Sequence, residues 1–364
     1  MTHPILQEDI ESIFKIVGND LTRLQGKRVL ITGGTGFIGT WLLETIFWLN
    51  KNCNQPCKVY VPTRSPEAFA CKAPHLASNS EIVLLPGDIA DFKYPDDDCN
   101  FIIHAAAPGE PRSLIHDSLG VVETIVRGTR RVLELATQKN VEGFLFVSSG
   151  AVYGVQPPDL GRIPEDYLGA PDVTSILSAY GEAKRYAEML CTLYHQKYGL
   201  PIHIARPFTF IGPYQDLNAG FAITDFIRDG LQGGPLMILG DGTTVRSYCY
   251  AADMTAMLWK ILMKSPVGRA YNVGSDESIS ILELANKVIS FLDPSVEVIV
   301  MSKPNFKPKP ARYVPDINRG RLELCINVHT NIDKAIQHTL AWFSEANIGM
   351  ARFFSGSLES GNKL

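Results

Sequence analysis

Tyr180 and Lys184 stand four residues apart in a stretch predicted to be helical, so their side chains share one face. A nearby ammonium lowers the pKa of a phenol, and a tyrosine with a lowered pKa can remove the proton of a substrate hydroxyl. Ser149 lies about thirty residues before Tyr180, just after the apolar run FLFV, and its hydroxyl can orient the same substrate oxygen. On its own, a tyrosine and a lysine at this spacing more often lie on an exposed helix face and have no catalytic role. The catalytic interpretation therefore depends on the glycine-rich segment nearer the N-terminus.

That segment is residues 29–40, VLITGGTGFIGT, in which a short apolar run leads into glycines and then into an amphipathic pattern. Gly33, Gly36 and Gly39 give the GxxGxxG spacing. Backbone N–H groups converge at such a turn, the helix dipole favours negative charge, and the missing Cβ atoms allow close approach. The segment predicts a site for the pyrophosphate of a dinucleotide.

Apolar, β-branched runs alternate with helical patterns along most of the chain, which predicts a doubly wound parallel sheet of the Rossmann type with about seven strands. Such sheets bind ligands at the carboxyl ends of their strands, so the loops that follow the strands should hold the functional residues. The expected strands lie near residues 28–32, 58–62, 82–86, 100–104, 143–148, 201–206 and 270–273.

Composition narrows the class of protein further. The formal net charge is -4 and no long run of Lys or Arg is present, so there is no electrostatic case for binding nucleic acid or a membrane surface. We found no stretch of about 18 apolar residues and no signal peptide, which predicts a cytoplasmic protein. The seven cysteines are scattered, which favours ordinary thiols over a zinc site or a disulfide framework, and we predict no metal.

Several residues at strand ends bear on the choice of cofactor. Arg64 ends the second predicted strand, where an NAD enzyme usually carries an acidic residue, and an arginine there can pair with a 2′-phosphate. We therefore expect NAD(P), with NADP favoured over NAD, unless Arg64 is simply solvated. Asp88 follows the third strand and either accepts a hydrogen bond from adenine or caps a turn. Ala105 and Ala106 allow a flat cofactor near the backbone, or reflect tight packing.

Seven ordered motifs carry a resemblance to a known family: TGGTGFIG, GDIAD, HAAA, SSGAVYG, YGEAK, RPFTFIGP and GDGTTVRSYCYAADM. Together they resemble the extended short-chain dehydrogenase/reductase superfamily, in its sugar-nucleotide epimerase/dehydratase branch. The resemblance covers roughly residues 27–345. It implies an N-terminal Rossmann domain, a smaller C-terminal α/β lobe for a nucleoside-diphosphate sugar, and a homodimer.

With this resemblance the chain divides into an arm, two lobes and a tail. The helical periodicity of Ile10, Ile13 and Val17 predicts an N-terminal helical arm, which either packs on the main body or serves a subunit contact. The expected divisions are the arm at 1–26, the Rossmann domain at 27–210 completed by about 247–274, the nucleotide-sugar lobe at 211–246 and 275–350, and a frayed tail at 355–364.

The resemblance also implies roles for single residues. Ser149 would steady the reacting oxygen, Tyr180 would be the base and Lys184 would hold the nicotinamide ribose. The residues implied against the cofactor are Gly33, Thr35, Gly36, Phe37 and Ile38 at the glycine turn, Asp88 and Ile89 beside the adenine, and Pro207 beside the nicotinamide. Those implied against the substrate are Ser113, Thr209, Asn218, Arg246 and Arg312, where the arginines suit a diphosphate because their planar forks hold two oxygens at once.

Two positions depart from the dehydratases that this chain resembles. Gly150 and Ala151 stand where those enzymes carry an Asp-Glu pair that removes water across C5 and C6 of the sugar. Neither side chain can move a proton, so elimination by that route is not expected. Decarboxylases of the branch usually keep a glutamate at the position of Ala151, so the alanine also weakens the interpretation as a decarboxylase.

We therefore expect hydride transfer at C4 of a nucleoside-diphosphate sugar through a 4-keto intermediate, with epimerisation as the favoured outcome. An NADPH-dependent 4-ketoreductase of a deoxysugar is the first alternative, and Arg64 favours it. A 4,6-dehydratase with other acid and base residues, such as Glu110 or Glu165, is a further one. A catalytically inactive dinucleotide-binding sensor is the alternative outside enzymes, although the glycine turn, Tyr180 and Lys184 are all present.

Overall fold

The structure is a computed structural model that describes residues 4–109, 116–302 and 310–359, with side chains described as far as residue 345. Its centre is a sheet of seven parallel strands in the order β11-β6-β5-β4-β1-β2-β3. The predicted doubly wound Rossmann sheet is confirmed, and the seven expected segments are its strands. These are β1 (Arg28–Thr32), β2 (Lys58–Thr63), β3 (Ile82–Pro86), β4 (Phe101–His104), β5 (Gly143–Val147), β6 (Ile202–Pro207) and β11 (Ala270–Val273).

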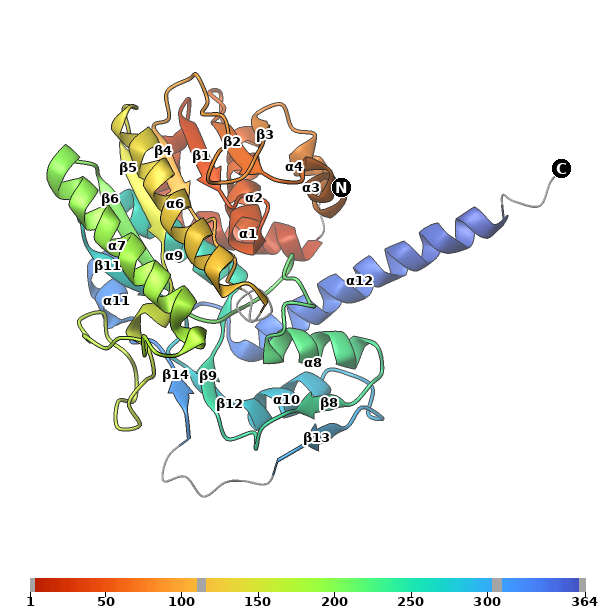
Figure 1. Cartoon of the computed structure of the whole chain (residues 1–364). Coiled ribbons are helices and arrows are strands. Elements are labelled where there is room, and N and C mark those ends of the chain that lie inside the picture. The colour runs from red at the N-terminus through yellow and green to blue at the C-terminus, as the bar shows by residue number, and fades with distance from the viewer. Residues whose placement is uncertain (1–3, 110–115, 303–309, 360–364) are drawn as a thin grey trace.

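Helices cover both faces of this sheet (Figure 1). α6 (Ser118–Thr137) and α7 (Ala179–Tyr198) pack together on one face, whereas α2 (Phe37–Lys51) and α9 (Ala251–Lys264) pack on the other. Because both faces are covered, the middle of a central strand is apolar on both sides: Val29, Leu30 and Ile31 of β1 are completely buried.

The remaining elements build the arm, the loops around the sheet and a set of smaller sheets. The strand orders of these sheets are β12-β9-β14, β13-β8 and β10-β7. The elements are α1 (Pro4–Val17), η1 (Gly18–Leu24), α3 (Pro66–Lys72), α4 (Pro74–Ala77), η2 (Gly150–Tyr153), η3 (Ile176–Ser178), β7 (Phe210–Ile211), α8 (Ala222–Leu231), β8 (Leu236–Ile238), β9 (Val245–Ser247), β10 (Cys249–Tyr250), β12 (Ser278–Ser280), α10 (Ile281–Ile289), β13 (Val298–Val300), β14 (Arg312–Tyr313), α11 (Asn318–Leu324) and α12 (Ile332–Glu359).

The two ends of the chain meet the body in different ways. Near the N-terminus, α1 packs against α9, and the buried Asp9 accepts a hydrogen bond from the Tyr250 hydroxyl at 2.6 Å. At the other end, α12 runs out from the body (Figure 1). It continues to Glu359, five residues into the segment expected to fray, and that stretch contains no proline to end the helix. Residues 360–364 lie outside the described residues.

The glycine turn between β1 and α2 brings backbone segments too close together for side chains. Gly33 has a φ of +69°, and a Cβ there would lie 2.8 Å from the backbone of Ala105, in the loop after β4. Ala105 N in turn donates to Thr32 O at 3.1 Å. The turn therefore presents bare backbone at the carboxyl edge of the sheet. Within the described part of the chain, no helix is both long and apolar enough to cross a bilayer.

Candidate active site

A cavity of about 760 Å³ opens at the carboxyl edge of the sheet, between the glycine turn and the loop after β7. It joins residues from both ends of the predicted site, so one ligand can contact the turn and the catalytic group together. The predicted site residues that line it are Gly33, Thr35, Gly36, Phe37, Ile38, Ala105, Ser149, Tyr180, Lys184, Pro207 and Thr209.

Lys184 is the electrostatic centre of this cavity. Its side chain is only 2% exposed, and its ammonium donates to Val147 O, the last residue of β5, at 2.7 Å. Burial lowers the pKa of Lys184 to about 8, while the neighbouring Glu188 carboxylate raises it. The ammonium lies 5.9 Å from the centre of the Tyr180 ring. A lysine in this place stays largely protonated near neutral pH and favours the phenolate of Tyr180.

Tyr180 itself faces Ser149. Burial raises the pKa of Tyr180, and a hydrogen bond with the Ser149 side chain opposes that shift. Ser149 is the N-cap of the short helix η2, where its Oγ accepts from Ala151 N at 3.1 Å. The serine hydroxyl is therefore fixed by a backbone contact while it faces the phenol. This arrangement can take a proton from an alcohol and hold the oxygen that remains.

A half-buried ion pair lies next to the lysine. Glu188 lies one helical turn beyond Lys184 on α7, accepts from Ser148 Oγ at 2.6 Å, and binds Arg206 of β6 through both carboxylate oxygens at 2.9 and 2.6 Å. Arg206 also donates to the Tyr153 hydroxyl at 2.8 Å. The pair joins α7 to β6 directly below the catalytic group, and sequence reasoning did not identify it.

Residues expected at the adenine end lie outside the lining of this cavity. Arg64 is exposed beyond the end of β2. Asp88 uses one carboxylate oxygen to accept from Ala90 N at 3.0 Å, which is the turn-capping role left open from the sequence. Ile89 packs against Gly128 of α6, and Ala106 N donates to Thr32 Oγ1 at 3.3 Å.

The residues expected against the substrate are spread more widely. Thr209 lines the cavity, whereas Asn218 is exposed on the loop that follows β7. Arg246 and Arg312 lie on the paired strands β9 and β14, and Arg246 places its guanidinium 5.9 Å from the centre of the Tyr313 ring. Arg312 keeps its Nε buried without a hydrogen-bond partner among the described residues. Ser113 lies outside the described residues, as does Glu110.

Glu165, an alternative acid or base in the sequence interpretation, does not line the cavity. Its Oε1 accepts from Asn272 N at 3.0 Å and its Oε2 lies 3.7 Å from Arg319, so the carboxylate joins loops behind the site. Ala151, by contrast, lines the cavity with a side chain that cannot move a proton. The part of the chain that the structure describes holds no cluster of three or more metal-ligating side chains.

The lining residues that sequence reasoning missed include three with large polar side chains: Tyr313, Lys72 and Tyr214. Tyr313 reaches the cavity from β14, and Lys72 reaches it from the end of α3, where its ammonium donates to Thr35 O at 3.1 Å. Tyr214 covers the cavity from the loop after β7, with a φ of 70° and its hydroxyl bound to the buried Glu44 at 2.5 Å. The sequence offered one signal for Lys72, namely a basic residue soon after the second strand, where a phosphate of the cofactor is expected. For Tyr313 the only signal was its position next to Arg312.

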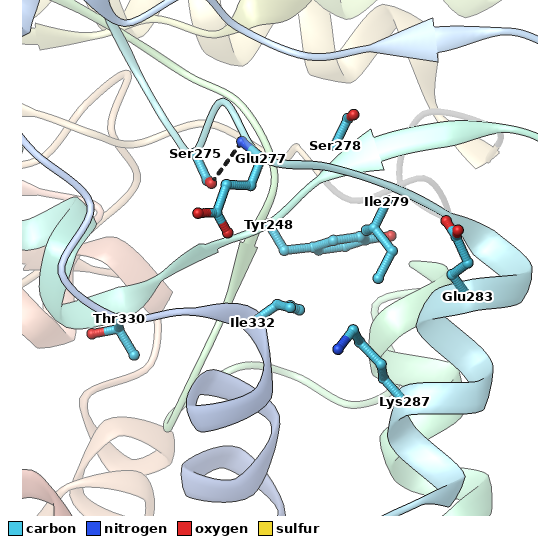
Figure 2. Close-up of a pocket in the computed structure, with 9 residues that line it drawn as sticks. All are labelled: Tyr248, Ser275, Glu277, Ser278, Ile279, Glu283, Lys287, Thr330 and Ile332. Carbon is cyan, nitrogen blue, oxygen red and sulfur yellow. Dashed lines mark hydrogen bonds between the residues drawn. The ribbon is translucent and has the colours of Figure 1, made fainter.

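A second, smaller cavity of about 270 Å³ lies between β12, α10 and the start of α12 (Figure 2). Tyr248 lies across it, and Lys287 points into it from α10 while pairing with Asp333 at 2.6 Å. None of the predicted site residues lines this cavity. The two cavities share no lining residue.

A glycine turn after the first strand, a Ser-Tyr-Lys group in the same cavity and a second set of strands beside it are the features of an extended short-chain dehydrogenase/reductase. The chain belongs to the NAD dependent epimerase/dehydratase family, whose family model matches residues 29–274, and it is an enzyme of that family. The residues present fit a dinucleotide, because the turn is bare backbone that a Cβ would fill.

Similar proteins fall into several reaction classes of this family. UDP-glucuronic acid decarboxylase 3 of Arabidopsis thaliana is 31% identical over 81% of this chain and 82% of its own length. UDP-glucuronic acid 4-epimerase from Bacillus cereus, in complex with UDP-glucuronic acid and NAD, superposes with a TM-score of 0.75 at 25% identity, over 88% of this chain and 99% of its own. A dTDP-glucose 4,6-dehydratase from Streptomyces venezuelae, with NAD bound, superposes with a TM-score of 0.74 at 25% identity. The match covers 87% of this chain and 97% of the dehydratase.

The support that Glu188 gives to Lys184 predicts a pH effect. Glu188→Gln removes the carboxylate that raises the pKa of Lys184, so the ammonium is lost at a lower pH. The alkaline limb of the rate profile should move to lower pH by about 1 unit. Glu182→Gln, on the same helix but paired with Arg185 at the surface, is the matched control and should leave the profile unchanged. An unchanged limb in Glu188→Gln, with the fold intact by circular dichroism, would contradict this coupling.

Proposed function

We propose that this enzyme is a 4-epimerase of a nucleoside-diphosphate sugar, acting through a 4-keto intermediate with NAD(P). The observation that carries the proposal is the single cavity that joins the glycine turn to Ser149, Tyr180 and Lys184. A sugar hydroxyl placed between the serine and the phenol would lie at the nicotinamide end of a dinucleotide held by that turn.

The residues of the chain would act in a fixed order. Tyr180, with its phenolate favoured by Lys184, would take the proton of the C4 hydroxyl. Ser149 would hold the oxygen that becomes the carbonyl. A dinucleotide held at the glycine turn would supply hydride acceptor and donor chemistry at C4. After the ketone has turned its other face to the nicotinamide, Tyr180 would return its proton to the C4 oxygen, which completes the C4 epimer.

The missing carboxylates support epimerisation over elimination. Gly150 and Ala151 follow Ser149 directly, and the side chain that lines the cavity there is a methyl group. Water loss across C5 and C6 needs an acid and a base at that place, whereas a 4-epimerisation needs neither. Arg64, which favoured a reductase from the sequence, is exposed and does not line the cavity.

A sugar that carries a carboxylate is the substrate class with the most support. The decarboxylase relatives and the 4-epimerase neighbour are all named for UDP-glucuronic acid. Arg246 is half-buried beside the cavity and forms no ion pair within the described residues, so an anionic group of the substrate would be its partner. Decarboxylation of the same uronic acid is a second candidate, favoured by the identity to the decarboxylases.

The proposed function predicts tightly held cofactor and no net redox change. Mass spectrometry of the denatured protein should release a dinucleotide, and incubation with nucleotide uronic acids should change the sugar without net change in reduced-nicotinamide absorbance. Tyr180→Phe should lower turnover by at least about 100-fold and keep cofactor binding, because it removes the general base. Loss of the mass of carbon dioxide from the product would identify a decarboxylase instead. An empty protein that consumes added NADPH would contradict the proposal.

We also propose that the preference between the two dinucleotides depends on Lys72. Its ammonium lines the cavity at the glycine turn, whereas Arg64 is exposed outside it. Burial lowers the pKa of Lys72 to about 8, and the charge of Asp216 opposes this shift. A half-buried ammonium with one carbonyl partner has donors left for a phosphate.

Lys72→Met should weaken NADP binding about 10-fold, a free-energy change of about 1.4 kcal/mol, and NAD binding much less. Arg64→Met is the matched control and should leave both affinities near those of the wild type. Calorimetric titration of the two dinucleotides measures the difference. Equal weakening of NAD and NADP would place the lysine on the pyrophosphate, and no weakening of either would refute the contact.

A homodimer built on the outer face of α7 is our proposal for the assembly. Tyr186, Met189 and Leu193 repeat at helical spacing on that face and are 46%, 55% and 50% exposed. The face lies on the outside of the molecule beside α6 (Figure 1). Such an apolar stripe on a paired helix layer suits a second copy of the same helices.

Leu193→Asp would place a charge within this stripe and should convert a dimer to a monomer in sedimentation experiments. Leu322→Asp on α11, where the leucine is 85% exposed, is the matched control and should leave the assembly unchanged. A wild-type protein that sediments as a monomer, or a Leu193→Asp variant that remains a dimer, would contradict the proposal.

A further inference from the structure

The loop between β7 and α8, residues 212–221, borders the large cavity opposite the glycine turn. The loop residues that line the cavity are Tyr214, Gln215, Asp216, Ala219 and Phe221. Tyr214 has a φ of 70°, in the left-handed region that residues with a side chain rarely adopt. A strained backbone of this kind persists only where surrounding contacts hold it. The contacts of Tyr214 therefore show what fixes the loop.

The first set of contacts comes from α2, the helix that begins directly after the glycine turn. Trp41 donates from its Nε1 to Pro213 O at 3.0 Å, and its ring meets the Tyr214 ring edge-on, with the centres 6.4 Å apart. The Tyr214 hydroxyl donates to the buried Glu44 at 2.5 Å. Burial and the Glu44 carboxylate raise the pKa of Tyr214, so the phenol stays protonated and keeps donating. The loop and the glycine turn are thus fixed to the same helix.

The second contact comes from α12, near the other end of the chain. Trp342 places its ring edge-on to the Tyr214 ring, with the centres 4.9 Å apart. α12 is itself fixed to the N-terminal arm, because His338 Nδ1 lies 3.5 Å from the Asp9 carboxylate of α1. A helix outside the central sheet therefore contacts the residue that borders the cavity.

Lys72 joins the loop to the glycine turn. Its ammonium donates to Thr35 O in the turn and lies 5.8 Å from the centre of the Tyr214 ring. A dinucleotide at the turn would lie in the cavity between the turn and the loop. The loop would then have to leave its contacts on α2 and α12 before that dinucleotide could leave the turn.

We propose that Tyr214 is a cofactor-retaining residue and that Trp342 is the positioning residue that holds it against the cavity. The inference uses the dinucleotide site and goes beyond the proposed C4 epimerisation, because retention can be measured without any sugar. An enzyme whose cofactor returns the hydride to the same sugar needs that cofactor to stay bound through turnover. Opening of a loop over a site often sets the rate at which its ligand is released.

The release rate of NAD tests the proposal. Protein loaded with radiolabelled NAD is chased with excess unlabelled NAD, and the label that remains bound is measured at timed intervals. Trp342→Ala should release NAD about 10-fold faster than the wild type, the size expected for the loss of one aromatic contact. Tyr214→Ala should release it at least as fast. The double variant should match Tyr214→Ala alone, because Trp342 acts through Tyr214. Tyr214→Phe, which keeps the ring and removes only the bond to Glu44, should show a smaller acceleration.

Phe343→Ala is the matched control, because Phe343 is the next residue on α12 and is also half-buried against the core. Within the described residues, the rings that contact Tyr214 are those of Trp41 and Trp342. Phe343→Ala should lower the melting temperature about as much as Trp342→Ala and leave NAD release unchanged. Unchanged release in Trp342→Ala or in Tyr214→Ala would overturn the inference. Equal acceleration in Phe343→Ala, or additive effects in the double variant, would also overturn it. Slow NAD release from a protein that epimerises no nucleotide sugar would refute the proposed function and support this inference.

Discussion

The burial of one lysine ammonium constrains the centre of this molecule. Lys184 is almost completely removed from water, and a buried charge is tolerated only where hydrogen bonds and an opposite charge compensate for lost hydration. Val147 O at the end of β5 supplies the hydrogen bond, and Glu188 supplies the charge. Glu188 is itself held by Arg206 of β6. The lysine thus fixes α7 against two central strands and places Tyr180 at the mouth of the cavity.

The same constraint links stability to chemistry. The Glu188–Arg206 pair joins α7 to β6, so it is part of the fold as well as of the electrostatics of Lys184. Burial raises the pKa of Tyr180, and a nearby ammonium favours the phenolate, so the cation opposes the effect of burial on this phenol.

Much of this arrangement follows from local sequence. The seven strands are short apolar runs with turn residues after them, and the glycine turn and the Tyr180–Lys184 spacing are contained within single segments. Tyr313 and Lys72 were missed because their places depend on packing between distant segments: β14 pairs with β9, and α3 lies against the glycine turn. Arg64 follows β2 with an exposed side chain, and its contact with a cofactor stays a prediction. Strand ends can be predicted from sequence, but side-chain direction beyond them cannot.

The central claim is that one bound cofactor takes the hydride from C4 and returns it to the same carbon. A nucleotide uronic acid carrying deuterium at C4 tests this most directly, with the product examined by nuclear magnetic resonance. The account predicts that the deuterium stays at C4 of the epimerised sugar through turnover, with none in free cofactor. Deuterium that leaves the sugar with released, reduced cofactor, or a C4 that never exchanges its configuration, would contradict it.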